Sequence, residues 1–348
     1  MGEFSKPELR HDVIDRQNIM TDSAREARWI VGVDVGGTKV AAGLVNEQGE
    51  LSQPIRAPMN PRGTAAEGFA AVTSVLDKVF NDKRKDNSDT PIGVCAPGPL
   101  DPRTGVVLNP PNVPCWRNFP LVAELQRRYG VTARLDNDAN AAALAESLWG
   151  AGRGYSNVFY ACIGTGIGTG VVFDGRIFHG RTGSAAEGGH VSIDYRGPTC
   201  NCGKKGCIEA LASGTAIARR AREAVSGDPT AGARLLGLAN GDGSSIRSEM
   251  IGTAAQMNDP LAQQILADTI EFLAIWLGNI VDLLEPDVMI LGGGVSEMLR
   301  PGFPQIQDRL KTWCVNARCC EIPLVPAHYG ENSGVAGGAA LCFVPAEN

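Results

Sequence analysis

The sequence predicts an α/β protein made of two related lobes. Predicted strands alternate with predicted helices along the chain, as α/β folds require. A strand–glycine–strand unit occurs once in each half, which indicates duplication of a domain. The length of 348 residues is enough for roughly two domains of ordinary size.

The first half begins with a buried strand at residues 29–35. Gly36 and Gly37 follow it, and residues 39–45 are again extended, so this unit is expected to be a hairpin with glycines in its turn. The remaining expected elements of this half are an amphipathic helix at 65–80, a polar loop at 81–90, short strands at 91–96 and 131–135, and a helix at 139–149 capped by Asn137 or Asp138.

The second half repeats the strand–glycine–strand unit at residues 158–173. Apolar residues at helical spacing over 261–284 predict one long helix with a buried stripe. A strand at 287–291 precedes three glycines, and a Gly- and Ala-rich helix is expected at 333–342.

Composition and charge exclude several classes of protein. The 32 Lys and Arg against 38 Asp and Glu give a net charge of −6, which is unfavourable for binding a phosphate backbone. The most apolar run, 272–281, is too short to span a bilayer and is flanked by Glu271 and Asp282. Ten cysteines without a secretory signal favour a reducing, cytoplasmic location, and neither nucleic-acid nor membrane partners are expected.

Glycine is enriched and clustered, with 43 in the chain. The clusters lie at 34–39, 164–170 and 292–294, and none has Walker A or Rossmann spacing. Glycine-rich turns expose backbone N–H groups to anionic oxygens, and Asp34 at a strand end is suited to a hydrated Mg²⁺. A single cluster is most simply a tight turn, but three in two similar halves indicate a nucleotide held between lobes.

One histidine and three cysteines form a second cluster: His190, Cys200, Cys202 and Cys207. This set suits tetrahedral Zn²⁺, and four protein ligands leave no open position, so the metal is expected to be structural. A disulfide and a coincidental cysteine-rich loop are the alternatives. Folding around a metal would bring Glu187 and Glu209 near the imidazole, where they could bind sugar hydroxyls; the alternative is solvated loop charge.

If the bound nucleotide gives a phosphoryl group to an alcohol, the reaction needs a base near the attacking hydroxyl. Asp138 is the candidate, because it lies at a strand-to-helix junction where the helix N-terminus adds positive potential. Its alternative role is an N-cap, and Asp136 is a rival carboxylate in the same segment.

Taken together, these motifs resemble the ROK family of bacterial sugar kinases (repressors, open reading frames, kinases) in the actin–hexokinase–Hsp70 superfamily. The resemblance runs in order from about residue 30 to 343. It is carried by the segments 33–39, 135–142, 163–170, 186–190, 200–209 and 291–294.

This resemblance implies a two-lobed actin-like ATPase (ribonuclease H-like) fold with a duplicated βββαβα core and an inserted zinc loop. We expect a disordered extension at 1–28, a first lobe at 29–146 onto which a helix at 331–345 packs back, and a second lobe at 147–330 with the zinc loop at 190–207. The family is expected to form homodimers.

The resemblance also assigns site residues. Asp138 would be the catalytic base, and Mg-ATP and structural Zn²⁺ would be the cofactors. Sugar contacts are expected from Gly98, Asn112, Asn137, Asp138, Glu187, His190 and Glu209, zinc contacts from His190, Cys200, Cys202 and Cys207, and ATP contacts from Asp34, Gly36, Gly37, Thr38, Lys39, Gly164, Thr165, Gly166, Gly292, Gly293 and Gly294.

The expected activity is ATP-dependent phosphorylation of the 6-hydroxyl of glucose. Kinases of N-acetylmannosamine, N-acetylglucosamine or fructose are the alternatives. A sugar-responsive repressor would carry a winged helix domain of roughly 70 residues before the first glycine hairpin, whereas 33 residues precede Asp34. Gly188 stands where the family usually has a larger apolar residue, which predicts a looser wall behind the sugar.

Overall fold

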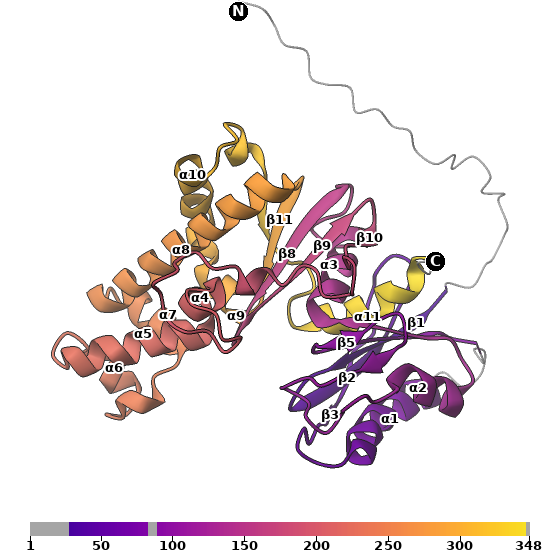
Figure 1. Ribbon diagram of the computed structural model, residues 1–348. Helices are drawn as coiled ribbons and strands as arrows, with labels where there is room; N and C mark the ends of the chain where they lie inside the picture. Colours follow the sequence, from indigo (N-terminus) through magenta and orange to yellow (C-terminus); the bar gives the residue numbers. More distant parts are fainter. Residues whose placement is uncertain (1–27, 83–88, 346–348) are drawn as a thin grey trace, which may run out of the picture.

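The computed structural model describes residues 28–82 and 89–345. The expected extension at 1–28 therefore lies, but for Arg28, outside the described residues, as does most of the loop predicted at 81–90. Within the described part, the chain forms two lobes, each built on a five-stranded mixed sheet (Figure 1).

The two sheets have the same strand order. In the first lobe the order is β3-β2-β1-β4-β7, and in the second it is β10-β9-β8-β11-β12. Each sheet starts with antiparallel strands and continues with parallel ones, so the duplicated core predicted from the sequence is confirmed. The strands are β1 (Ile30–Val35), β2 (Lys39–Val45), β3 (Ile55–Pro58), β4 (Ile92–Ala96), β7 (Ala133–Asn137), β8 (Asn157–Ile163), β9 (Ile167–Phe173), β10 (Arg176–Ile177), β11 (Val288–Gly292) and β12 (Leu324–Pro326).

Helices cover the outer faces of both sheets. The first lobe carries α1 (Ala65–Asp82), α2 (Leu121–Tyr129) and a small hairpin of β5 (Leu100–Asp101) and β6 (Val106–Val107). The second lobe is larger, because a helical insertion separates β10 from β11 (Figure 1). Its helices are α4 (Ile208–Ala212), α5 (Gly214–Gly227), α6 (Ala233–Leu238), α7 (Ser248–Gln256), α8 (Pro260–Leu284), α9 (Gly294–Leu299) and α10 (Phe303–Trp313).

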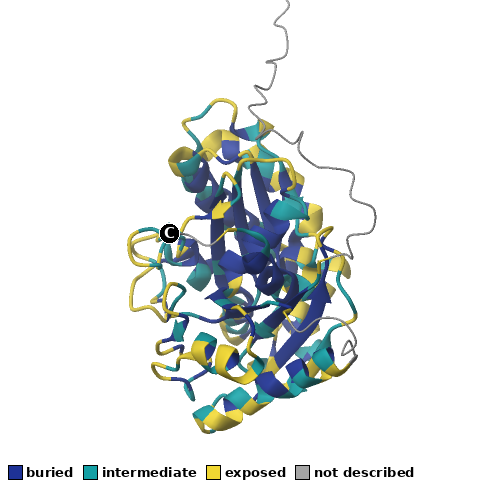
Figure 2. Ribbon diagram, turned by 90° about the vertical axis from the view of Figure 1, so that its right-hand side faces the viewer, coloured by how far each residue is buried: buried dark blue, intermediate teal, exposed yellow. Residues whose placement is uncertain are grey.

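Two helices pack against each other between the sheets. Helix α3 (Asp138–Leu148) contacts β8 and β9 of the second sheet, and α11 (Ser333–Phe343) contacts β1 and β4 of the first. Helix α3 is rich in alanine and α11 is rich in alanine and glycine, and Figure 2 shows this middle region as buried. The small side chains let the two backbones approach closely, so that a Cβ built on Gly337 would lie 2.6 Å from the carbonyl carbon of Ala141.

Helix α8 is long and apolar enough to span a bilayer by length and composition, but 56% of its apolar window is buried inside the protein. Leu273, Trp276 and Leu277 on its inner face are fully buried in the core of the second lobe. The apolar stripe predicted over 261–284 therefore serves the core, where it packs against α7 and α10.

Several element boundaries differ from those predicted. The strand expected at 131–135 runs from Ala133 to Asn137, so helix α3 begins at Asp138 with Asn137 as its N-cap. Helix α1 continues to Asp82, into the segment predicted as a loop. The lobe boundary expected after residue 146 falls inside α3, and the division into lobes by residue number stays a prediction.

We expect Gly337→Ala to destabilise the fold by about 1–3 kcal/mol, because the added methyl group would press α11 away from α3. The control is Gly237→Ala in α6, where an added Cβ has no neighbour within 4 Å. A helical glycine with that much space should gain about 0.5–1 kcal/mol from alanine. Equal denaturation midpoints for the two variants would contradict the close helix contact.

Candidate functional site

The first two glycine clusters form equivalent turns. Residues 36–38 connect β1 to β2 after the pair Val35–Val40, and residues 164–166 connect β8 to β9 after the pair Ile163–Ile167. The N–H of Gly36 donates to the carbonyl of Lys39 at 2.9 Å, and the N–H of Gly164 donates to that of Gly166 at 2.9 Å. Each turn therefore lies at the same place in its own sheet.

Asp34 lies near the end of β1, beside the first turn. Sγ of Cys95 on β4 lies 3.6 Å from Oδ1 of Asp34 and 3.1 Å from the carbonyl oxygen of Gly334, contacts that the sequence did not indicate. Burial raises the pKa of Asp34, while the positive charges of Lys39 and Arg56 act against that rise. The first turn also meets the loop of Asn112, since a Cβ on Gly37 would lie 2.8 Å from the carbonyl oxygen of Asn112.

Asn137 and Asp138 occupy the junction of β7 and α3. The Asn137 Oδ1 accepts from the N–H of Ala139 at 3.0 Å and caps the helix, and its Nδ2 lies 3.6 Å from where a Cβ on Gly98 would stand. Asp138 is the first helical residue and is exposed. The capping role that competed for Asp138 thus belongs to its neighbour, although the Asp138 Oδ1 also accepts from Ala139 N at 2.8 Å.

Two carboxylates from distant segments, Asp34 and Glu187, act electrostatically on Asp138. The surrounding protein disfavours the charged form of Asp138, and the negative charges of Asp34 and Glu187 add to that effect, so that its pKa rises to about 6. The N–H group of Ala139 acts in the opposite direction. A carboxylate with this pKa is ionised at neutral pH, and it is a stronger base than an ordinary aspartate.

The rival carboxylate, Asp136, is buried and fully engaged. Its Oδ2 lies 2.6 Å from Nε2 of His179, and its Oδ1 accepts from the backbone N–H of Asn137 at 2.7 Å and from Nδ2 of Asn140 at 3.2 Å. His179 follows β10 in the second lobe, so this contact links the lobes next to Asp138. Asp136 therefore orients the junction, and Asp138 has the accessible carboxylate.

His190, Cys200, Cys202 and Cys207 come together as one group, with their ligand atoms all within 4.8 Å of one another. Nδ1 of His190 is 3.6 Å from Sγ of Cys200, and Sγ of Cys202 is 3.6 Å from Sγ of Cys207. Tetrahedral zinc with Zn–S bonds of about 2.3 Å requires sulfur–sulfur distances of about 3.8 Å. The donor set and its spacing therefore fit zinc.

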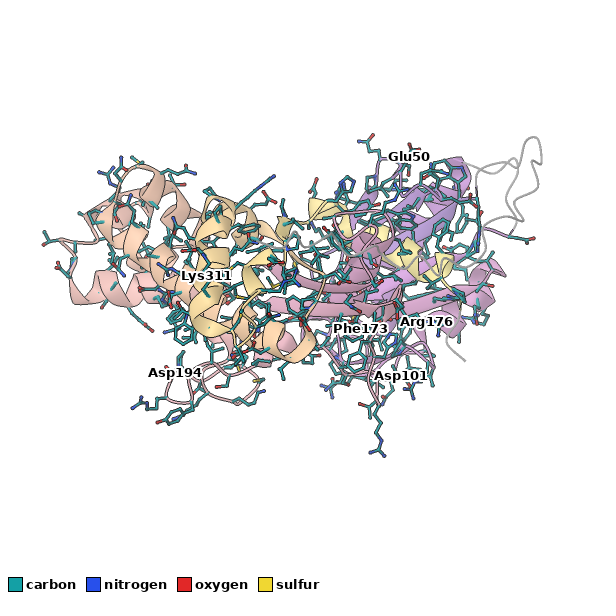
Figure 3. All side chains as sticks on the ribbon, turned by 90° about the horizontal axis from the view of Figure 1, so that it is seen from above. Glu50, Asp101, Phe173, Arg176, Asp194 and Lys311 are labelled. Atoms are coloured by element: carbon teal, nitrogen blue, oxygen red, sulfur yellow. The ribbon has the colours of Figure 1, made fainter. Side chains whose placement is uncertain are left out.

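Glu209 connects this cluster to the second glycine turn. Its Oε1 lies 3.9 Å from Nδ1 of His190, and its Oε2 accepts from the N–H of Ile167 at 2.9 Å. Glu187 lies differently: it is exposed and acts on the pKa of Asp138. In Figure 3, Asp194 marks the loop that carries the cluster, while Glu50 marks the turn that follows β2 in the first lobe.

The third glycine cluster lies against the second. Gly293 has a φ of +89°, and a Cβ there would be 2.5 Å from the carbonyl oxygen of Ile163. The start of α5 joins them, because Gly214 N donates to the Gly164 carbonyl at 2.8 Å and a Cβ on Gly214 would lie 3.2 Å from Cγ2 of Val295. Gly214 was missed from the sequence, although the Ser213 cap before an amphipathic segment was a usable signal.

The looser wall expected at Gly188 stays a prediction. A Cβ on Gly188 would lie 2.7 Å from Oγ1 of Thr169, and the Gly188 N–H donates to that oxygen at 2.8 Å. The indole of Trp276 donates to the Gly188 carbonyl at 3.0 Å. Thr169 therefore lies where a side chain at position 188 would begin, and Trp276 holds the Gly188 carbonyl.

The chain is similar to known glucokinases in both sequence and structure. The chain is 32% identical over 313 residues to a glucokinase of Thermotoga maritima, covering 90% of this chain and 96% of the relative. A glucokinase of Halalkalibacterium halodurans is 34% identical over 316 residues, covering 90% and 94%. A ROK family glucokinase from Streptomyces griseus, solved in complex with glucose and AMPPNP, superposes with a TM-score of 0.75 at 33% identity and covers 90% of this chain and 98% of that one.

The actin-like fold expected from the sequence is thereby confirmed, since these relatives share the architecture over nearly their full length. The family description "ROK family" matches residues 30–343, which include both glycine turns, the Asn137–Asp138 junction and the Cys–His cluster. The chain belongs to the ROK family.

Proposed function

We propose that this protein is an ATP-dependent hexose kinase that phosphorylates the 6-hydroxyl of glucose. One observation carries the proposal: Asp138 lies within electrostatic reach of Asp34, beside the first glycine turn, and of Glu187, beside the Cys–His cluster. A group between a phosphate-binding turn and a candidate sugar site is placed to act on the hydroxyl that joins them. The glucose and AMPPNP bound to the Streptomyces griseus relative support this choice of substrates.

The nucleotide would be held by the three glycine clusters. The N–H groups of Gly36 and Gly164 bond within their own turns, so phosphate oxygens would bind the N–H groups of Gly37, Thr38, Thr165 and Gly166. The hydroxyls of Thr38 and Thr165 belong to the same turns. Gly292, Gly293 and Gly294 together with the N-terminus of α5 would receive the rest of the nucleotide. Mg²⁺, held through water by Asp34, would neutralise charge on the phosphates.

The sugar would be held by groups on both lobes. From the first lobe, Asn137 offers its Nδ2 beside Gly98, and Asn112 lies against the first turn. From the second lobe come Glu187, His190 and Glu209, the last fixed by its bond to Ile167. Carboxylates and an imidazole held in this way are suited to several neighbouring hydroxyl groups.

Asp138 would accept the proton of the 6-hydroxyl as that oxygen attacks the γ-phosphorus. The bond from phosphorus to the ADP oxygen breaks as the new P–O bond forms, and the proton remains on the carboxylate until product leaves. The N-terminus of α3 favours the ionised base, which partly offsets the effect of burial on the pKa of Asp138.

We expect Asp138→Asn to lower kcat by about 100-fold or more while leaving the sugar affinity and melting temperature nearly unchanged, because the amide cannot accept the proton. Asp136→Asn is the contrasting variant. It disturbs the pair with His179 and should lower the melting temperature clearly. Steady-state kinetics and thermal unfolding of both proteins test this, and wild-type kcat in Asp138→Asn would exclude Asp138 as the base.

The pKa of Asp138 predicts the acidic limb of the pH profile. The base must be ionised to work, so kcat/KM should fall about tenfold per pH unit below pH about 6 and level off above it. The limb should disappear in the residual activity of Asp138→Asn. A profile that stays flat down to pH 4.5, with the protein still folded, would contradict this assignment.

Zinc would be structural and would keep Glu209 and His190 in place. We expect about one zinc per chain by elemental analysis, and Cys202→Ser should lose zinc and raise the sugar KM before global unfolding. Cys115→Ser changes a thiol outside the cluster and is the control. Fully active protein without zinc would reject the structural role.

The proposal also names glucose as the preferred sugar, which a substrate panel can test. Turnover with glucose, fructose, N-acetylglucosamine and N-acetylmannosamine, each at saturating ATP, compares the expected substrate with its alternatives. A kcat/KM for an N-acetylated sugar that exceeds the glucose value would shift the assignment within the family. The homodimer and the cytoplasmic location stay predictions.

A further inference from the structure

The chain has two connections near the C-terminal end of α3. Residues 149–156 lead from α3 to β8, and residues 327–332 lead from β12 to α11. Because α3 lies on the second sheet and α11 on the first, the second connection passes from one lobe to the other. Contacts made by this segment can therefore control how the lobes move relative to each other.

One buried side chain binds both connections. Glu146, in the last turn of α3, has no exposed surface. Its Oε2 accepts from the N–H of Ala151 at 2.9 Å, and its Oε1 accepts from the N–H groups of His328 at 2.8 Å and Tyr329 at 3.1 Å. Three backbone donors from two distant segments thus converge on one carboxylate.

The same segment is attached to the first lobe on its other side. The hydroxyl of Tyr329 donates to the carbonyl of Gly49 at 3.0 Å, and Arg56 on β3 donates to Oδ1 of Asn332 at 3.0 Å. The indole of Trp149 donates to the carbonyl of Glu47 at 3.1 Å in the same turn of the first lobe. Residues 328–332 are therefore fixed to the first lobe. Glu146 connects the same residues to α3 through hydrogen bonds.

We propose that Glu146 is a positioning residue that sets the pivot for movement between the lobes, an inference that rests on the proposed kinase function. Helix α3 carries Glu146 near one end and Asp138 at the other. Eight residues at 1.5 Å each separate them by about 12 Å. A rotation of about 5° at the pivot would move Asp138 by about 1 Å, which is enough to cost about 100-fold in rate.

The pivot also explains why a charged group is buried here. Glu146 itself has no exposed surface, whereas Ala151 and Tyr329 are half-buried and His328 is exposed, so the three N–H groups satisfy a carboxylate that water does not reach. A carboxylate provides two oxygens in fixed relative positions, whereas an amide provides one. Glu146 therefore keeps residues 151 and 328–329 at a fixed distance from each other, without changing the packing inside either lobe.

The test uses two variants of Glu146 in the full chain. Glu146→Leu fills the same space without accepting hydrogen bonds, and Glu146→Gln keeps one acceptor oxygen if the leucine variant does not fold. Asp259→Leu is the matched control, because Asp259 is a buried carboxylate that caps α8 and pairs with Arg234, away from both connections. All three proteins should melt at lower temperature than the wild type.

Only the Glu146 variants should also change kcat and the extent to which the two lobes close when ligands bind. We expect kcat for glucose to fall at least tenfold with KM within threefold of wild type. The decrease in radius of gyration on adding glucose and AMPPNP, measured by X-ray scattering, should drop to less than half. Tyr329→Phe, which removes the bond to Gly49, should give the same effects in weaker form.

The outcomes separate the pivot from the proposed function. Glu146→Gln with wild-type kcat and a wild-type scattering change, and a loss of stability like that of Asp259→Leu, overturns the pivot. A wild-type protein that phosphorylates no hexose overturns the kinase function instead. In that case the scattering change with AMPPNP alone still tests the pivot, because a smaller change in both Glu146 variants than in Asp259→Leu supports it and equal changes reject it.

Discussion

The close packing of α3 against α11 is the constraint on which the site depends. These helices lie between two sheets, and their glycine and alanine residues bring backbones nearly into contact. Because α3 starts immediately after β7, the same packing fixes where its N-terminus faces. Asp138, at the start of α3, therefore lies within electrostatic reach of Asp34 on the first sheet and of Glu187 in the second lobe.

Around α3, a few polar side chains connect segments that lie far apart in the sequence. Asp136 binds His179 beside the junction, Glu209 binds the second glycine turn beside the Cys–His cluster, and Glu146 binds both connections at the far end of α3. Each is at least partly buried, where a hydrogen-bonded carboxylate interacts more strongly than in water. The proposed catalytic geometry thus rests on buried contacts at both ends of one helix.

Some features followed from local pattern because their causes are local. Alternating strands and glycine turns predicted the duplicated core, and the spacing of His190, Cys200, Cys202 and Cys207 predicted one four-ligand group. The choice between Asn137 and Asp138 as cap was not local, because either side chain can accept the bond and only the backbone of β7 decides where the helix begins. The contacts of Gly188 are not local either, because its neighbours Thr169 and Trp276 are remote in the sequence.

The sequence by itself determined the family, the two-lobed α/β class, the three glycine clusters and the candidate zinc ligands, since each depends on residue type and short-range spacing. Tertiary structure alone decided which carboxylate faces solvent, how Cys95 meets Asp34, how α5 joins the second turn, and how Glu146 links the connections. Those relations arise where two packed lobes bring remote segments within hydrogen-bond distance, and no periodicity along a single chain encodes a distance between segments that meet only after folding.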